Sequence, residues 1–273
     1  MAVTMADIQH LRKMTGAGMM DCKKALEEAN GDFDKAMEII RKKGQAVAAK
    51  REDREAAEGC VLAKTEGEFA AIVALQCETD FVAKNEEYIA LTQEILDAAI
   101  SNKPANKEEL LKISLPAGTV EQVITDKMAS TGEKMELGSF EFLTAPFVTS
   151  YIHMGNKLAT IVGFNKADVD KSVAKDIAMQ IAAMNPVAIT PEGIPAEIKQ
   201  RELDLAKEKA REAGKPENLL DRIAEGSLNK FYKDFTLLQQ DYVKDPKKTI
   251  AQFIKEHDKD LEVVAFKRVS LNV

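Results

Sequence analysis

The spacing of apolar residues changes near Gly59 from a helical period to a strand-like one. Before this point, three segments carry apolar residues three or four positions apart, which is typical of amphipathic helices. The break at Thr15–Gly18 separates the first two segments, and Gly44 is expected to end the third. The sequence therefore predicts a three-helix bundle over residues 1–45, followed by a polar, partly helical linker over residues 46–58.

After the linker, the chain contains two similar strand-turn-strand units, each followed by a helical segment. The first unit comprises Cys60–Thr65 and Glu68–Gln76, and the second comprises Tyr151–Met154 and Lys157–Asn165. Their second strands align as Phe-Ala-Ala-Ile-Val-Ala-Leu and Leu-Ala-Thr-Ile-Val-Gly-Phe. This internal repeat predicts an α+β fold with a duplicated core, in which helices pack on two antiparallel sheets.

The second half of the chain also predicts a projecting helical hairpin. Ala196–Ala213 is highly charged with a narrow apolar stripe, and apolar residues recur at spacings of three and four from Leu220 to Phe235. Two such segments joined by a tight turn are typical of an antiparallel helical hairpin. The alternating segment Leu261–Val269 is expected to return to the second sheet. We therefore divide the core into two subdomains, 59–145 and 146–273, the second including the hairpin at about 196–240.

Composition argues against direct binding to nucleic acid or to a membrane. It has 273 residues, 45% of them hydrophobic and 30% charged, with a net charge of -7. Because binding to phosphate backbones needs a basic face, this acidic balance argues against nucleic acid. No apolar run approaches the roughly 20 residues that span a bilayer, and no signal-peptide pattern opens the chain. The three cysteines are not closely paired, which is typical of the reducing cytoplasm.

Candidate catalytic and metal-binding groups are sparse. His10, His153 and His257 are far apart in sequence and no Cys-x-x-Cys occurs, so neither a metal site nor a cofactor is expected. The sequence leaves open a nucleophilic pair of Cys77 and His153, although no local signature supports it. We expect that the protein is not an enzyme.

The stretch Cys77–Asn85 places an acid and a large aromatic side chain where a predicted buried strand ends. Thr79 and Asp80 are both good helix N-caps, and Asn85 gives a second possible start, so a helix is expected to begin within a few residues. The neighbouring Asp80 and Phe81 admit two interpretations. Either Phe81 lies in the core behind a capped helix, as large apolar residues usually do, or its ring is exposed and wedges into a partner.

Two motifs resemble the bacterial elongation factor Ts family, whose members exchange nucleotide on the GTPase elongation factor Tu. They are Lys13-Met-Thr-Gly-Ala-Gly-Met-Met-Asp-Cys-Lys-Lys-Ala-Leu26 and Cys77-Glu-Thr-Asp-Phe-Val-Ala-Lys84, in the family's order and separation. The resemblance covers nearly the whole chain and implies a ubiquitin-associated-like N-terminal domain and a duplicated core. It also implies a cytoplasmic guanine nucleotide exchange factor that promotes GDP release during translation elongation.

The resemblance assigns partner-binding roles to two sets of residues. The first is a segment that enters the GTPase and disturbs magnesium and phosphate binding, namely Thr79, Asp80, Phe81 and Val82. Further contacts are implied at Arg12, Met19, Met20, Gly132 and His153. Because the two methionines share the first turn of a helix, both cannot point inward, and one is expected to be exposed. Before the glycine of the second intruding loop the family has an apolar residue, whereas this chain has Thr131.

An exchange factor must bind the nucleotide-free GTPase more tightly than the GDP-bound form, so both states of elongation factor Tu are implied partners. A homodimer or a 2:2 assembly with the GTPase stays open. Two alternatives of other classes are an adaptor or chaperone that uses the N-terminal bundle, and an enzyme. The chain ends at Val273 without the C-terminal helix that some family members use as a second grip, and this departure predicts weaker affinity.

Overall fold

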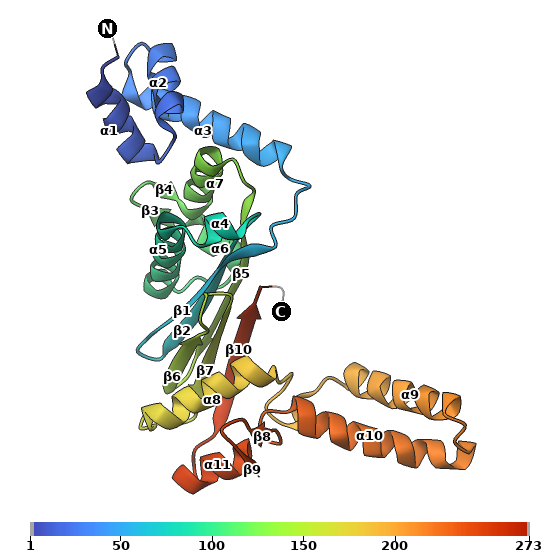
Figure 1. The fold of residues 1–273 in the computed structure, drawn as a ribbon. Helices are drawn as coiled ribbons and strands as arrows, with labels where there is room; N and C mark the ends of the chain where they lie inside the picture. The colour runs from blue at the N-terminus through green and yellow to red at the C-terminus, as the bar shows by residue number, and fades with distance from the viewer. Residues whose placement is uncertain (1–2, 272–273) are drawn as a thin grey trace.

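The computed structural model describes residues 3–271 and begins with a compact bundle of three helices (Figure 1). These are α1 (Met5–Thr15), α2 (Met19–Glu28) and α3 (Phe33–Lys50). Thr4 forms a capping box with the first turn of α1, and the helix ends at Gly16, whose φ of 66° is easily adopted by glycine. The bundle has a small core of its own around the fully buried Leu11 and Leu26.

Helix α3 runs past Gly44, so the predicted helix end at this residue is wrong. A Cβ atom at Gly44 would lie 2.8 Å from the carbonyl oxygen of Thr125 and 3.2 Å from the Cβ of Ala129. Both residues belong to α7 (Val120–Thr131) of the core. Glycine is therefore needed at this position because two helices cross closely, and the crossing docks the N-terminal bundle on the core. The predicted linker is helical as far as Lys50.

The first core sheet is antiparallel with strand order β1-β2-β5. Its strands are β1 (Glu58–Glu66), β2 (Phe69–Cys77) and β5 (Met135–Thr144). The helices packed on it include α7 and three others: α4 (Asp80–Ala83), α5 (Glu86–Asn102) and α6 (Lys107–Lys112). A short pair, β3 (Ser114–Leu115) and β4 (Gly118–Thr119), precedes α7 and was not predicted.

The second sheet is also antiparallel, with strand order β10-β7-β6. Its strands are β6 (Phe147–Ile152), β7 (Leu158–Phe164) and β10 (Val263–Ser270). The smaller elements beside it are α8 (Lys171–Met184), α11 (Ile250–His257), β8 (Asp241–Tyr242) and β9 (Asp245–Thr249). The predicted hairpin is present as α9 (Ala196–Glu212) and α10 (Leu220–Phe235), which project from this subdomain (Figure 1). No helix in residues 3–271 is long and apolar enough to cross a membrane.

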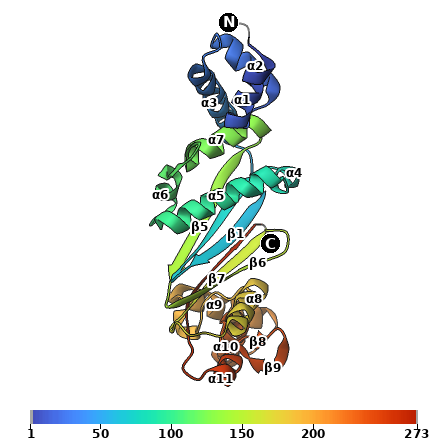
Figure 2. The same cartoon turned by 90° about the vertical axis from the view of Figure 1, so that its left-hand side faces the viewer.

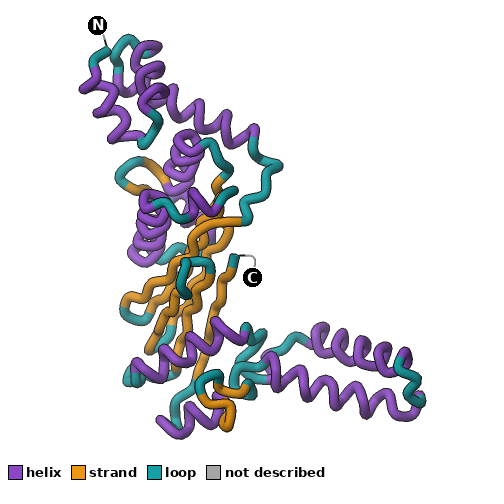
Figure 3. The backbone as a smooth tube through the Cα atoms, viewed as in Figure 1, coloured by secondary structure: helices purple, strands orange, loops and turns teal. Residues whose placement is uncertain are grey.

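The two sheets share an apolar layer, and the strands gather at the centre of the molecule with helices at both ends (Figure 3). Ile72 of β2 and Ile161 of β7 are fully buried in this layer. Val73 and Leu75 lie on the opposite face of β2 and pack against the helices of the first subdomain. Because side chains point alternately to the two faces of a strand, a strand that is buried on both faces has a continuous apolar sequence. The mixed helix and sheet architecture confirms the predicted α+β class.

Candidate protein-binding site

The chain leaves β2 through two consecutive N-capped helices. Thr79 caps α4, where its Oγ1 accepts a hydrogen bond from the backbone N–H of Val82 at 3.4 Å. Asn85 caps α5, where its Oδ1 accepts from the N–H of Glu87 at 2.9 Å. Asn85 was among the predicted caps, and of the two alternatives Thr79 and Asp80 the structure selects Thr79. Because α4 is one turn long, the residues between the caps form a short, ordered turn at the side of the molecule (Figure 2).

The ring of Phe81 lies in solvent on this turn. Phe81 is 84% exposed, whereas Val82 packs partly against the core and Ala83 is buried. The interpretation that Phe81 lies in the core is therefore wrong. A phenylalanine is usually buried, so the exposed ring makes this turn a candidate contact surface.

Asp80 presents a charged group next to the Phe81 ring. Lys84 donates a hydrogen bond from Nζ to Oδ2 of Asp80 at 2.6 Å, and this bond lowers the pKa of Asp80. The carboxylate is therefore ionised at neutral pH. Exposed ion pairs of this kind contribute little to stability. Asp80 can thus exchange Lys84 for a donor on a partner at small cost.

His153 and Met154 form an exposed turn close to the same surface. His153 follows the last residue of β6, so it lies just outside the strand in which it was predicted, and its Nδ1 is 3.0 Å from the hydroxyl oxygen of Tyr151. Met154 is 90% exposed. The turn is joined to β1, because the carbonyl of Asn156 accepts a hydrogen bond from the N–H of Val61 at 2.7 Å. In Figure 2, α4 and the β6–β7 turn lie on the same side of the molecule.

The N-terminal bundle presents a second exposed apolar surface. Met19 and Met20 occupy the first turn of α2 and are 41% and 63% exposed. The prediction placed one methionine outward, whereas both are exposed. This happens because Cys22, Ala25 and Leu26 supply the buried face of the short helix. Arg12 is also exposed, near the end of α1 and one loop away from the methionines.

The loop after α7 contacts the segment Thr79–Val82, which we call the wedge. Gly132 ends α7 with a φ of 73°, so the chain turns sharply there. The next residue, Glu133, accepts two hydrogen bonds from Thr79: one from its N–H at 3.1 Å and one from its hydroxyl at 2.7 Å. The structure therefore brings the two segments assigned to partner binding into one continuous unit. Glu133 was not identified from the sequence, because nothing local signals a contact between residues this far apart.

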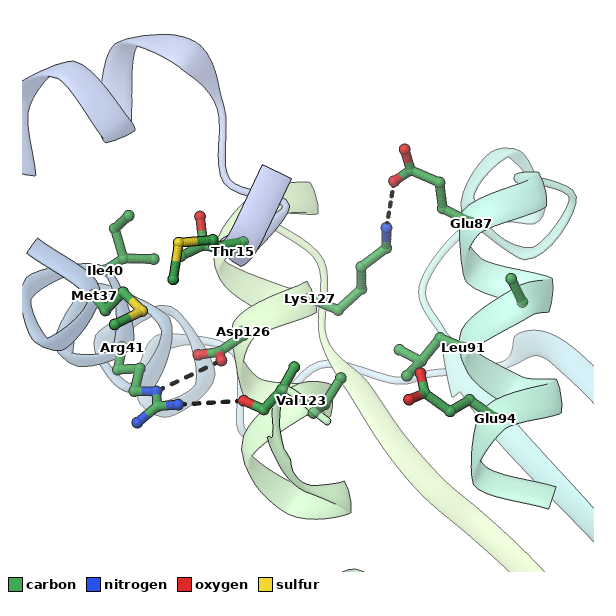
Figure 4. Close-up of a pocket in the computed structure, with 13 residues that line it drawn as sticks. Thr15, Met37, Ile40, Arg41, Glu87, Leu91, Glu94, Val123, Asp126 and Lys127 are labelled. Atoms are coloured by element: carbon green, nitrogen blue, oxygen red, sulfur yellow. Dashed lines mark hydrogen bonds and ion pairs between the residues drawn. The ribbon is translucent and has the colours of Figure 1, made fainter. Parts of the chain in front are cut away.

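A cavity of about 340 Å³ lies where the N-terminal bundle meets the core (Figure 4). Its apolar lining includes Met37 and Leu91. Two ion pairs lie at its walls: Arg41 with Asp126 at 3.8 Å, and Lys127 with Glu87 at 2.8 Å. Burial raises the pKa of Asp126 against the opposing effect of Arg41. These charges connect α3, α5 and α7, so we interpret the cavity as a junction between domains.

The environment of the Cys77 thiol keeps it protonated. Cys77 is buried and donates from Sγ to the carbonyl of Thr79 at 3.3 Å. Burial raises the pKa of the Cys77 thiol to about 11, which leaves it protonated at neutral pH. Among residues 3–271, no group of three or more His, Cys, Asp or Glu side chains could hold a metal ion.

Known proteins match this chain over its full length. A family model described as Elongation factor TS matches residues 78–272. The chain is 64% identical over 273 residues to Elongation factor Ts of Porphyromonas gingivalis (strain ATCC 33277), covering 100% of this chain and 99% of that relative. It is 54% identical over 273 residues to Elongation factor Ts of Azobacteroides pseudotrichonymphae, covering 100% of both. It is 50% identical over 272 residues to Elongation factor Ts of Christiangramia forsetii, covering 98% of both. The chain belongs to the elongation factor Ts family.

Proposed function

We propose that this protein is a guanine nucleotide exchange factor that promotes GDP release from elongation factor Tu during translation elongation. The observation that carries the proposal is the Phe81 ring, 84% exposed on a turn whose backbone is fixed by two helix caps. A rigid apolar group of this kind can fill a gap between elements of a partner. Membership of the elongation factor Ts family supports the choice of partner.

The mechanism is exchange by differential binding. A GTPase holds its nucleotide through a phosphate cradle and a magnesium ion. A factor can shift this equilibrium only as far as it binds the nucleotide-free state better than the GDP-bound state. In this protein, the ordered wedge fits the open GTPase and is excluded from the closed one. Phe81 separates GTPase elements, while Thr79, Asp80 and Val82 complete the intruding segment.

The effect on magnesium is indirect. Asp80 brings an ionised carboxylate to the front of the wedge, and its ion-pair partner Lys84 is exposed and easily displaced. Inside the GTPase, this carboxylate competes for groups that hold the magnesium shell. The chain needs no nucleotide site, cofactor or catalytic group of its own for this step, and on this basis it is not an enzyme.

Other surfaces supply affinity and orientation. Arg12, Met19 and Met20 on the N-terminal bundle offer a cationic and an adaptable apolar contact to a helix of the GTPase. His153 contributes a polar contact from the β6–β7 turn, and Gly132 brings the loop after α7 close to the wedge. The partner places the protein in the cytoplasm. A homodimer or a 2:2 assembly with the GTPase is compatible with this arrangement.

The test is release of a fluorescent GDP analogue from purified elongation factor Tu. We expect strong acceleration by the unaltered protein and loss of most of it in Phe81→Ala, with a smaller loss in Asp80→Ala. Phe235→Ala serves as a matched control, because Phe235 is 39% exposed on the projecting hairpin. Full activity of Phe81→Ala would refute the wedge, and no acceleration by the unaltered protein would refute the exchange function and favour an adaptor.

A further inference from the structure

A pair of neighbouring carboxylates holds the base of the wedge. Glu133 accepts from the N–H and the hydroxyl of Thr79, at 3.1 Å and 2.7 Å. Glu78 accepts from the N–H of Lys134 and from Arg51, both at 2.6 Å. The two segments therefore bind each other reciprocally: Glu133 binds the residue after Glu78, and Glu78 binds the residue after Glu133.

The bonds from Thr79 to Glu133 determine how α4 begins. A threonine hydroxyl has one hydrogen to donate, and in Thr79 it is given to Glu133. The lone pairs of the same oxygen remain directed toward the N–H of Val82, which they accept at 3.4 Å. Both bonds to Glu133 end on a carboxylate and belong to the stronger, charge-assisted class. Without them, the cap and the backbone N–H of Thr79 lose the group that orients them.

The same site also fixes the segment that leads from the N-terminal bundle into β1. Arg51 is the partner of Glu78, and the Nζ of Lys134 donates to the backbone carbonyls of Glu52 and Arg54, both at 2.9 Å. Partial burial opposes ionisation of Glu78, but the hydrogen bond from the Lys134 N–H and the charge of Arg51 outweigh it and lower the pKa of Glu78.

We propose that Glu133 is a positioning residue for nucleotide exchange, which holds Thr79 so that α4 presents Phe81 in the orientation needed to enter the GTPase. In this proposal Glu133 acts through its two hydrogen bonds to Thr79 and not by touching the partner itself. This inference rests on the proposed exchange function. It adds that the wedge is prepared before binding, so ordering the turn costs little when the complex forms.

The first arm of the test needs no partner. In Glu133→Ala, hydrogen exchange at the backbone N–H groups of Thr79, Val82 and Ala83 should accelerate by about ten- to a hundredfold, the equivalent of one charge-assisted hydrogen bond. Glu141→Ala is the matched control, because Glu141 lies on β5, the strand that follows Glu133 in the chain, and forms a 2.8 Å exposed ion pair with Lys267. Unchanged exchange in Glu133→Ala would overturn the positioning role, whatever the activity of the protein.

The second arm measures GDP release over a range of factor concentrations. We expect Glu133→Ala to lower the maximal rate by about tenfold while the half-saturating concentration changes little, because the other docking surfaces remain. Glu133→Gln keeps one acceptor and should recover part of the rate. A double variant with Phe81→Ala should be no slower than Phe81→Ala alone, since both act on one step.

Fully additive losses in the double variant, or a change confined to half-saturation, would overturn the positioning role. An unaltered protein that fails to accelerate GDP release would instead refute the exchange function itself. In that case, faster hydrogen exchange in Glu133→Ala would still establish that Glu133 fixes the turn. The two arms therefore separate failure of this inference from failure of the function on which it rests.

Discussion

The crossing of α3 and α7 gives a prediction in which two opposing effects can be separated. Replacing a helical glycine by alanine normally stabilises a helix by about 1 kcal/mol, because alanine has the higher helix propensity. At Gly44, however, the new methyl group would lie 2.8 Å from the Thr125 carbonyl oxygen and 3.2 Å from the Ala129 Cβ. The first contact is with backbone, which cannot rotate away. The two helices must therefore separate.

The magnitude follows from comparing these terms. Forcing a methyl group into a close-packed contact costs about 1–3 kcal/mol, which equals or exceeds the gain of about 1 kcal/mol from helix propensity. We expect Gly44→Ala to destabilise the protein by about 0–2 kcal/mol, measured from the midpoint of urea unfolding. Hydrogen exchange in α7 should also accelerate as the N-terminal bundle loosens.

Gly226 provides the matched control for this prediction. It lies within α10, and a Cβ atom placed there would have no neighbouring atom within 4 Å. Gly226→Ala should keep the propensity gain of about 1 kcal/mol, which would slow hydrogen exchange in α10 about fivefold. If Gly44→Ala stabilised the protein as Gly226→Ala is expected to, the argument that glycine is required by the helix crossing would be refuted.

Three further predictions concern a carboxylate, the buried thiols and the shared apolar layer. The pKa of Glu78 is lowered in the folded state, so its contribution to stability is present above the unfolded-state pKa and is lost as pH falls through the folded-state pKa. The N–H resonance of Lys134, which donates to Glu78, should report this loss when it is followed by NMR from pH 6 to pH 3. An unchanged resonance would contradict the prediction. Burial raises the pKa values of Cys60 and Cys77 to about 11, so about one thiol in a thousand is ionised at pH 8, and both should react with a thiol reagent only on unfolding. Ile72→Ala should lower the free energy of unfolding by about 2–5 kcal/mol in urea titrations, and a loss below 1 kcal/mol would show that the layer between the sheets is loosely packed.

Periodicity predicted most of the helices and strands because it depends on local sequence. The hairpin α9–α10 and the repeated strand units were recognised this way, whereas the candidate caps were recognised from their residue types. The prediction failed at Gly44, where a glycine needed for contact between two helices was taken for a helix end. A close approach between distant segments leaves no trace in the spacing of residues along either one.

The candidate site was less accessible to sequence reasoning. The one-turn helix α4 is too short to have a period, so the sequence could not decide whether Phe81 is buried or exposed. The exposure of both Met19 and Met20 depends on how three other residues fill the small core of the bundle. Glu133 acts on Thr79 across a sequence separation of 54 residues, and only the folded chain reveals this contact.

The apolar layer between the two sheets has a consequence for where mechanical strain would accumulate in a complex. Val61 of β1 and Val148 of β6 are both buried in this layer, so the turn at the end of β2 and the turn after β6 are attached to one solid body. Close-packed interiors resist compression and transmit displacement. The distance between Phe81 and His153 is therefore expected to change little when a partner binds. In the proposed complex, a GTPase whose GDP-bound form does not match this spacing would have to deform around its nucleotide for both contacts to form.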